Sequence, residues 1–387
     1  WASKALDCPP LPENPVSQTL MSALPPGPFA RLAALLGEEK PGQAPISLAV
    51  GDPSGAVPDF VRAALAQSAA SFGHYPPIQG TDDWRQAAGE WLNRRFALNG
   101  ALDAERQVLP LNGTREGLFS VLFPLIPTRK AGAAPIVAMP NPFYQCYAAA
   151  ALAAEPPPLA AALVVAAVYI CSPSNPEGAV ADENYWRGLF ALADRHDFIV
   201  LADECYADIW FETPPACALT VRHAQTREQG GGGFARLLSF HSLSKRSGLP
   251  GLRSGMVAGC ETLIGKFRAF RNVAGPTMPG PLLAASAAAW RDEAHVEAGR
   301  QAYARKMVLA QEILGDRMTR PGGGFFLWLA VGNGEDFARR AWREQGVRLL
   351  PGAYMGRDVF DGRAGDGSLR SPAGRSAYPE KNQSNPG

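Results

Sequence analysis

Three polar residues in the stretch SFHSLSKRSGLPGLRSG (239–255) have types and spacing that could do chemistry. Ser242, Lys245 and Arg253 lie there among small residues, directly after an apolar run. The serine hydroxyl and the arginine guanidinium can bind a phosphate group. Desolvation and a second cation nearby lower the pKa of a lysine, so its amine can act as a base or form a Schiff base with an aldehyde. The alternative for Lys245 is a solvated helix face.

A buried carboxylate is predicted in FIVLADECYADIW (198–210). Asp203 follows four apolar residues and an alanine, so it should stand at the buried end of a strand, where a carboxylate needs a cation or hydrogen-bond donors. A protonated pyridine nitrogen would supply that charge, and Tyr206 could then reach the phenolic oxygen of the same ring. The alternatives are a capping or salt-bridged aspartate and an ordinary core tyrosine.

Two further polar sets also follow apolar runs. In SPSNPEG, the amide of Asn175 could donate to the same phenolic oxygen, and the alternative is simple turn chemistry. In NPFYQCY, the ring of Tyr144 could lie against a flat heteroaromatic ring, with Phe143 as the alternative stacking residue. Both aromatic side chains could instead pack in the core.

A phosphate seat is predicted in LNGTREGLFSVLF. Gly113 and Thr114 open a helix whose apolar face is Leu118, Val121 and Leu122. Free backbone N–H groups at a helix N-terminus, together with a threonine hydroxyl, can bind phosphate. Gly-Thr caps also begin many helices that bind nothing.

The elements that position these residues alternate along the chain. Short apolar runs predict strands, and longer amphipathic stretches predict helices between them. The strand candidates are PISLAVGDP, PIVAMPNP, AAVYICSPSNP, FIVLADE, LLSFHS, SGMVAGC and, near the C-terminus, GGFFLWLAV. Strands that alternate with helices indicate a mostly parallel sheet covered on both faces, with ligands bound beyond the carboxyl ends of the strands.

One helix can be described in more detail from its sequence. In DENYWRGLFALADRHD, Asp182 is the predicted N-cap. The predicted buried face consists of Tyr185, Leu189, Leu192 and Ala193. QGGGGF (229–234) is predicted to be a surface loop, because it lacks the spacing of a dinucleotide-binding fingerprint.

Composition bounds the class of protein. The chain has 387 residues, 47% of them apolar, with a formal net charge of +1, which fits a globular protein without a broad field for nucleic acid or a membrane. No apolar run is long enough for a membrane span, and the first residues do not resemble a secretory signal. Six scattered cysteines argue against a zinc site and a disulfide framework, so no metal and a cytoplasmic location are expected.

The order of the polar sets resembles the pyridoxal-phosphate enzymes of fold type I, the aspartate aminotransferase family. A phosphate seat, a stacking aromatic residue, Asn, Asp-x-x-Tyr and Ser-x-x-Lys with a later Arg follow one another over most of the chain. The resemblance implies pyridoxal 5'-phosphate as cofactor. It also implies an α/β fold with a large domain, whose mostly parallel sheet is covered by helices, plus a smaller α/β domain.

The resemblance implies a role for each matching residue. Lys245 matches the lysine bonded to the cofactor, and Asp203 matches the partner of the ring nitrogen. Asn175 and Tyr206 match the two contacts to the ring oxygen. The predicted catalytic residues are therefore Lys245, Asp203 and Tyr206, and Asn175 is also expected to contact the substrate.

The remaining matches concern the phosphate, the ring face and the substrate. The phosphate cup corresponds to Gly113, Thr114, Ser242 and Arg253, and Tyr144 fits the stacking position. Tyr75 resembles the tyrosine that reaches the phosphate of the neighbouring subunit, which implies a homodimer with composite sites. Gly51 matches the backbone position near the substrate carboxylate.

The alternation of short apolar runs with amphipathic stretches gives way to long helical stretches near residue 281, and the predicted domain boundaries follow from this change. Residues 21–50 are expected to join the small domain, 51–280 to form the large cofactor-binding domain and 281–371 to form the small C-terminal domain. Residues 1–20 and 372–387 are expected to be flexible or atypical ends. The chain begins with Trp1, and Met21 is a candidate natural start.

Stretches outside the cofactor motif resemble bacterial N-succinyl-diaminopimelate aminotransferases of lysine biosynthesis. They are PNPFYQCYAAAA, AAWRDEAHVEAGRQAYARK, GGFFLWLAV and EQGVRLLPGAYMGRD. This family anchors the substrate α-carboxylate with an arginine, for which Arg370 is the candidate. The chain departs from the family after Ser371, where polar and Pro/Gly-rich residues replace an apolar strand.

The expected reaction is transamination between glutamate and N-succinyl-2-amino-6-oxopimelate, giving 2-oxoglutarate and N-succinyl-LL-diaminopimelate. Three alternatives remain open. They are an aminotransferase acting on aspartate, alanine or acetylornithine-like substrates, a carbon–sulfur lyase on the same scaffold, and a cofactor-binding protein without turnover.

Overall fold

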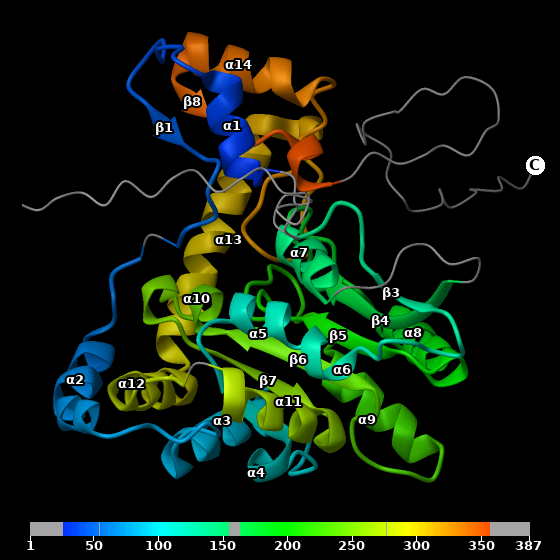
Figure 1. Cartoon of the computed structure of the whole chain (residues 1–387). Coiled ribbons are helices and arrows are strands. Elements are labelled where there is room, and N and C mark those ends of the chain that lie inside the picture. Colours follow the sequence, from blue (N-terminus) through cyan, green and yellow to red (C-terminus); the bar gives the residue numbers. More distant parts are fainter. Residues whose placement is uncertain (1–25, 54, 155–162, 276, 357–387) are drawn as a thin grey trace, which may run out of the picture.

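A six-stranded sheet forms the centre of the molecule (Figure 1). The computed structural model describes residues 26–53, 55–154, 163–275 and 277–356, and statements about the fold refer to these residues. In spatial order, the strands are β2 (Val108–Leu111), β7 (Gly255–Gly259), β6 (Leu237–Ser242), β5 (Ile199–Asp203), β4 (Leu163–Cys171) and β3 (Ala134–Ala138). Strands β3 to β6 are parallel, whereas β7 is antiparallel to both β6 and β2. The predicted α/β fold with a mostly parallel sheet is confirmed.

Helices cover both faces of this sheet. The first face carries α3 (Asp82–Arg95), α8 (Glu183–His196), α9 (Ala218–Glu228) and α12 (Gly280–Arg291), and we call it the α3 face. The second carries α5 (Thr114–Ser120), α6 (Leu122–Leu125), α7 (Gln145–Ala153) and α11 (Glu261–Ala274), and we call it the α5 face. Because side chains alternate along a strand, Val200 and Ala202 of β5 pack on the α3 face and Leu201 packs on the α5 face.

The remaining elements are short or lie at the ends of the described chain. They are α1 (Pro28–Leu36), β1 (Ile46–Ser47), α2 (Asp59–Gln67), η3 (Ala69–Gly73), α4 (Ala104–Gln107), α10 (Leu243–Arg246), η4 (Pro250–Leu252), α13 (Ala294–Leu314), η5 (Gly315–Arg317), α14 (Gly334–Gln345), β8 (Val347–Arg348) and η6 (Gly352–Met355). No helix in the described part of the chain has the length and apolarity required to cross a membrane.

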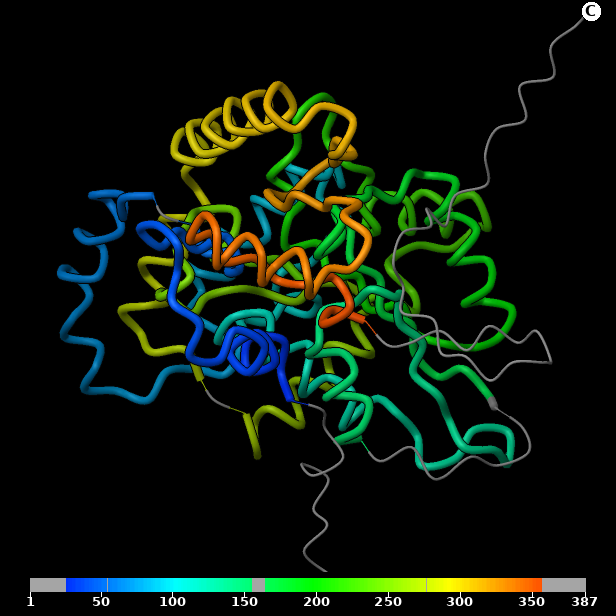
Figure 2. Tube along the Cα trace, turned by 90° about the horizontal axis from the view of Figure 1, so that it is seen from above, coloured from blue at the N-terminus to red at the C-terminus, as the bar shows by residue number. Residues whose placement is uncertain are grey.

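A second lobe combines the two ends of the described chain. Strand β1 pairs in parallel with β8, and Leu32 and Leu36 of α1 pack against Tyr354. Figure 1 shows this lobe above the sheet, connected to it by the long helix α13, and Figure 2 shows α1 beside α14 when the lobe is seen from above. The proposed domain boundaries stay predictions.

Helix α8 shows how the local sequence determines where a helix begins and which side it buries. The Asp182 side chain accepts a hydrogen bond from Tyr185 N at 2.7 Å, as predicted for an N-cap. The predicted buried face is wrong in part, because Tyr185 and Leu192 are each about half exposed. Trp186 and Phe190, four residues apart, are fully buried instead, and their larger rings determine which side of the helix faces the core.

Two predicted strands differ in the structure. PISLAVGDP contains only the two-residue strand β1, and GGFFLWLAV (323–331), all of it described, forms only isolated bridges at Gly323 and Leu329. Gly323 forms its bridge with Trp210 where the backbone passes close to Pro173, since an added Cβ would lie 2.5 Å from Pro173 Cγ. The following aromatic residues pack near Tyr206 instead of forming a ladder.

Candidate active site

The carboxyl ends of several strands meet at one edge of the sheet. Strands β2, β3, β4, β5 and β6 run in the same direction, because β3 to β6 are parallel and β7 is antiparallel to both of its neighbours. The predicted polar sets follow these strands, so the topology collects them at one edge. Figure 1 shows α5 and α10 beside this edge.

Asp203 is the last residue of β5 and is buried. Its side chain accepts hydrogen bonds from Tyr147 Oη at 2.6 Å and from Cys205 N at 3.3 Å. Burial raises the pKa of Asp203, although these hydrogen bonds and the Lys245 ammonium oppose that shift. No ion-pair partner for Asp203 occurs among the described residues, so the site can accept a buried cation from a ligand.

Lys245 lies in α10, the short helix that follows β6. Its Nζ donates a hydrogen bond to the carbonyl oxygen of Gly51 at 2.7 Å, and it lies 5.1 Å from the centre of the Phe325 ring. Burial lowers the pKa of Lys245, Arg115 lowers it further, and Asp203 opposes the shift. A lysine with a lowered pKa has a larger fraction of nucleophilic free amine at neutral pH.

Tyr206 and Asn175, which are both predicted to contact the ring oxygen of the cofactor, lie close to each other. The Asn175 Nδ2 atom donates to Tyr206 Oη over 3.4 Å, a long hydrogen bond. The Tyr206 ring is buried and lies edge-on to Phe325 and Phe326. Burial raises the pKa of Tyr206 well above its ordinary value, so the hydroxyl keeps its proton and can donate it to a neighbouring oxygen.

The predicted phosphate cup is a tight backbone cradle. Gly113 precedes α5 with φ +80°, and an added Cβ there would lie 2.2 Å from Arg253 Nη2. Thr114 Oγ1 lies 3.1 Å from Cys205 Sγ, and Ser242 Oγ accepts a hydrogen bond from Ser244 N at 3.1 Å. Backbone N–H groups, two hydroxyls and a guanidinium form a donor set that suits a phosphate, so the residues present fit the cofactor.

Arg253 closes one side of this cradle. It has φ +53°, and its Nη1 donates to Pro250 O at 2.8 Å while Nη2 lies 3.4 Å from Asn112 O. Its side chain is exposed in the single chain. The guanidinium therefore keeps donors available at the start of α5.

Tyr144 stands at the N-terminus of α7 with its hydroxyl bonded to a cation. Arg115 Nε donates a hydrogen bond to Tyr144 Oη, and the Arg115 guanidinium carbon lies 5.4 Å from the ring centre. Burial raises the pKa of Tyr144 to about 12. The neighbouring Phe143 is buried, whereas the Tyr144 ring is only partly covered, which leaves Tyr144 the better candidate for contact with a ligand ring.

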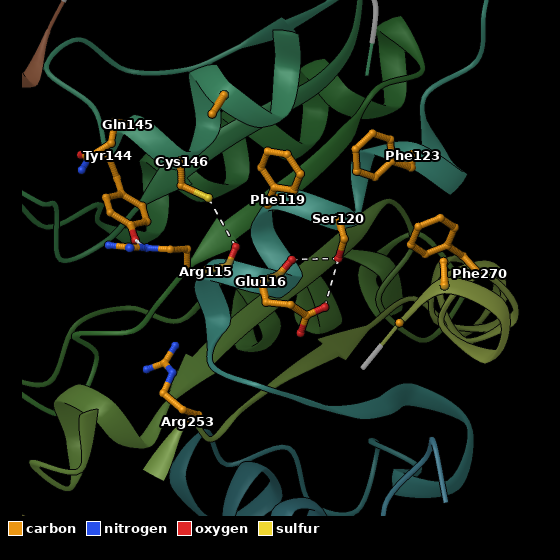
Figure 3. Close-up of a pocket in the computed structure, with 13 residues that line it drawn as sticks. Arg115, Glu116, Phe119, Ser120, Phe123, Tyr144, Gln145, Cys146, Arg253 and Phe270 are labelled. Atoms are coloured by element: carbon orange, nitrogen blue, oxygen red, sulfur yellow. Dashed lines mark hydrogen bonds between the residues drawn. The ribbon is translucent and has the colours of Figure 1, made fainter. Parts of the chain in front are cut away.

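A surface groove of about 660 Å³ begins beside these residues (Figure 3). At one end it has Arg115, Tyr144 and Arg253, and at the other it has Phe119, Phe123 and Phe270. The groove lies over α5, α7 and α11 on the α5 face. A cationic end near the phosphate cup thus continues into an aromatic surface.

The structure places two other predicted residues, Tyr75 and Gly51, in different surroundings, and a third lies outside the described part of the chain. Tyr75 is fully exposed, on the surface of the single chain. Gly51 lies against aromatic rings, because an added Cβ would be 2.9 Å from Phe325 Cε2 and 3.0 Å from Phe326 Cε1. Arg370 lies outside the described residues.

The sequence interpretation missed Tyr147, Arg115 and Cys205, which contact the predicted residues directly. For Tyr147 a signal existed: it lies three residues after Tyr144, so the two can share one side of a helix. The pairing of Thr114 with Cys205 had no such signal, because the two residues are 91 positions apart.

Comparison with known proteins identifies the class of this site. The family Aminotransferase class I and II matches residues 44–157 and 153–370, so this chain belongs to that family. Its members depend on pyridoxal phosphate, and the cofactor of this chain is pyridoxal 5'-phosphate.

Particular relatives differ in their substrates. The chain is 36% identical over 321 residues to the 4-dedimethylamino-4-oxo-anhydrotetracycline transaminase OxyQ of Streptomyces rimosus, covering 80% of this chain and 86% of OxyQ. It is 29% identical over 366 residues to an LL-diaminopimelate aminotransferase of Desulforudis audaxviator, covering 86% and 88% of the two chains. The solved aminotransferase AspB of Helicobacter pylori superposes with a TM-score of 0.79 at 34% identity, covering 86% of this chain and 91% of AspB.

Proposed function

We propose that this aminotransferase transfers an amino group between glutamate and N-succinyl-2-amino-6-oxopimelate, forming 2-oxoglutarate and N-succinyl-LL-diaminopimelate in lysine biosynthesis. The observation that carries the aminotransferase part is that Asp203 ends β5 and Lys245 follows the adjacent parallel strand β6, so both lie at the same edge of the sheet. The relationship to an LL-diaminopimelate aminotransferase supports the substrate class. The predicted cytoplasmic location stays a prediction.

We assign the residues these roles. The bound cofactor supplies an aldehyde that takes the amine and a ring that takes up the electron pair of the substrate Cα–H bond. Lys245 bonds the cofactor at rest, and once displaced it moves the proton at the substrate α-carbon through Nζ. Asp203 keeps the ring nitrogen protonated, and Tyr206 with Asn175 donates to the ring oxygen.

The other assigned residues bind and orient. Gly113, Thr114, Ser242 and Arg253 hold the phosphate, and Tyr144 covers one face of the ring. The carbonyl oxygen of Gly51 accepts a hydrogen bond from Lys245 Nζ in the structure, which places this backbone beside the lysine, and the N–H of Gly51 would donate to the substrate carboxylate. Arg370 remains the proposed carboxylate anchor.

We also propose a homodimer with composite active sites. The aromatic groove over α5, α7 and α11 opens beside the phosphate cup, and the Tyr75 side chain projects fully into solvent. A second copy would cover exposed apolar side chains such as Phe72, which is 67% exposed, and Val273, which is 91% exposed. Sedimentation equilibrium should give twice the chain mass, and a monomer that transaminates at full rate would exclude composite sites.

A second candidate acceptor is a polycyclic ketone. OxyQ, at 36% identity, is named for a ketone of the tetracycline type. The ring of Phe325 lies beside Lys245, stacks on the ring of Tyr303 and is tilted against the ring of Phe326. A flat apolar ring system suits such a surface better than an acidic chain does.

The test is a half-reaction followed by an acceptor panel. With cofactor bound, glutamate should bleach the absorbance band of the lysine-linked cofactor, and the acceptor that restores the band fastest identifies the substrate. The Lys245→Ala variant should lack the band and transfer the amine at least about 100-fold more slowly. Retention of the band in Lys245→Ala would overturn the assignment of this lysine.

The panel also separates the alternatives. It should contain N-succinyl-2-amino-6-oxopimelate, oxaloacetate, pyruvate, an acetylornithine-derived aldehyde and a tetracyclic ketone. Release of a keto acid from a sulfur amino acid without any acceptor would indicate a carbon–sulfur lyase. A stable band that no amino donor bleaches would indicate cofactor binding without turnover.

A further inference from the structure

Arg246 follows Lys245 in α10 and contacts a set of residues on the α3 face, away from the proposed cofactor. The exposed fraction of its side chain is 2%, which is unusual for an arginine. Its Nε lies 3.2 Å from Asp208 Oδ2, and its Nη2 lies 2.8 Å from Glu293 Oε1. Two carboxylates therefore face this buried guanidinium, and each also pairs with a second arginine, Asp208 with Arg95 and Glu293 with Arg94.

Two indole rings and a backbone carbonyl complete the surroundings of this guanidinium. The Arg246 Cζ atom lies 5.3 Å from the ring centre of Trp91 and 5.4 Å from that of Trp290. Its Nη1 donates to Ala289 O at 2.8 Å. Burial lowers the pKa of Arg246, but the carboxylates oppose the shift and the group remains charged. The contacts come from α3 and α12, so the short helix α10 is fastened to two long helices.

Asp208 carries the connection to the other half of the site. It lies two residues after Tyr206, and its Oδ1 accepts from Arg95 Nε at 2.7 Å. Arg95 Nη2 also donates to Ala207 O at 2.9 Å, which fixes the backbone of the same loop. The Arg246–Asp208 pair thus joins the turn that carries Lys245 to the loop that carries Asp203 and Tyr206.

We propose that Arg246 is a positioning residue for Lys245, which it holds at a fixed distance from Asp203 and Tyr206 through its pairing with Asp208. This inference rests on the proposed function, in which Lys245 bonds the cofactor. Lysine offers one point charge in place of a planar fork, so it cannot keep Asp208, Glu293 and the Ala289 carbonyl as partners at once. Displacement of reacting groups by about 1 Å is enough to slow a reaction by up to about 100-fold.

Arg246→Lys provides the main test. In the cofactor-loaded variant, the pH midpoint of the lysine-linked absorbance band should move by about half a pH unit or more, because the distances from Lys245 to its charged neighbours Asp52, Arg115 and Asp203 change. The kcat for glutamate should fall about 10-fold or more with KM much less affected. Asp208→Asn should shift the midpoint in the same direction as Arg246→Lys does, and it provides a second test of the proposal if Arg246→Lys folds poorly.

Arg222→Lys is the matched control. Arg222 is equally buried in α9, with two hydrogen bonds to Asp194 at 2.8 and 2.6 Å, one to Ala235 O at 2.8 Å and the Phe190 ring 5.3 Å away. This variant should lower the thermal unfolding midpoint of the cofactor-free protein and leave the band midpoint and kcat unchanged.

The outcomes separate the two proposals. If wild type and Lys245→Ala have the same spectrum, the proposed role of Lys245 is wrong and the inference falls with it. If wild type has the band but Arg246→Lys and Asp208→Asn only lower thermal stability, Arg246 is a structural residue and the inference alone is wrong. An equal spectral shift in Arg222→Lys would also overturn it. The double variant Arg246→Lys with Asp208→Asn should shift the midpoint by less than the sum of the two single shifts, since both variants break the Arg246–Asp208 pair.

Discussion

Two neighbouring carboxylates at the end of β5 face opposite sides of the sheet and have different surroundings. Asp203 meets Tyr147 on the α5 face. Glu204, the next residue, accepts hydrogen bonds from Ser239 Oγ, from Cys217 Sγ at 3.4 Å and from Ala218 N at 3.1 Å. Both carboxylates are buried, at 4% and 2% exposure, so the difference lies in what surrounds them.

The Glu204 side forms a closed network of protein groups. Ser239 bonds onward to His241 Nε2 at 2.8 Å, and the imidazole contacts the rings of Trp91 and Phe96. Burial lowers the pKa of His241 to about 3 and raises that of Glu204 to about 7. Groups of the protein thus hydrogen-bond one another in this space, and a ligand is not needed to satisfy them.

Among the described residues Asp203 forms no ion pair, and the cation whose charge acts on it is the ammonium of Lys245, which lies on the short helix after the neighbouring strand β6. Burial costs both carboxylates similarly, so burial alone does not mark a functional carboxylate. Neither carboxylate forms an ion pair among the described residues, so the distinguishing feature is the position of Asp203 on the side of Lys245, where a protonated ring nitrogen would provide the counter-charge.

Among substitutions that test the difference between the two carboxylates, Asp203→Asn is expected to have the largest effect on the reaction rate. Loss of the charge that holds the ring-nitrogen proton should slow glutamate-driven bleaching of the cofactor band by about 100-fold or more in single-turnover absorbance measurements. Glu204→Gln makes the same chemical change one residue later and should leave the bleaching rate nearly unchanged. Equal losses in the two variants would mean that the faces do not differ in function.

A smaller effect is expected from Gly113→Ala at the edge of the cofactor side. The alanine would have to adopt φ +80° and would force Arg253 away from the start of α5. The cofactor dissociation constant, measured by fluorescence titration, should rise about tenfold or more, which corresponds to about 1.4 kcal/mol.

Gly188→Ala in α8 is the control for this substitution. An added Cβ at Gly188 meets no atom within 4 Å, so the change should stabilise the helix slightly without affecting cofactor binding. Unchanged affinity in Gly113→Ala would exclude this cradle as the phosphate site.

The smallest effect concerns the stability contributed by Glu204. The folded state raises its pKa from 4.5 to about 7, so between these values the folded protein holds a proton that the unfolded chain has lost. The contribution of Glu204 to the free energy of unfolding therefore falls as the pH rises through this window. Glu204→Gln lacks this loss, and its stability relative to wild type should increase by about 2 to 3 kcal/mol from pH 5 to pH 8.

Urea unfolding of the cofactor-free proteins at several pH values measures this difference. Groups other than Glu204 titrate alike in both proteins, so their contributions cancel unless they couple to the mutated residue. A pH-independent difference would show that Glu204 keeps its ordinary pKa, and a decrease with pH would reverse the sign of the argument.

Much of the α5 face was predictable from the sequence. Asp203 and Ser242 are the last residues of their strands, and Asn175 follows β4, so each polar residue stands where an apolar run stops. The parallel topology brings these strand ends together. Leu118, Val121 and Leu122 are all buried, as their helical spacing indicated. Local pattern is sufficient here because each signal lies within a few residues.

The α3 face was not predictable in the same way. Glu204, Arg246 and Asp208 read as ordinary charged residues, because their partners come from distant helices. The missing strand at GGFFLWLAV has a similar cause: tertiary contacts of Phe325 and Phe326 override a strong strand propensity. Arg370 cannot be compared, because it lies outside the described residues.

The pairing of β1 with β8 has a consequence for synthesis of the protein. Ile46 is opposite Val347, and Trp342 Nε1 donates to Glu39 O at 2.7 Å, so α1 finds its partners about 300 residues later in the chain. On the ribosome, the apolar stripe of α1 emerges early and remains uncovered until almost the whole described chain has been translated. The central sheet can assemble during that interval, whereas the second lobe must form among the last events. Chains released before α14 is translated would leave Leu32 and Leu36 exposed to chaperones and prone to aggregation.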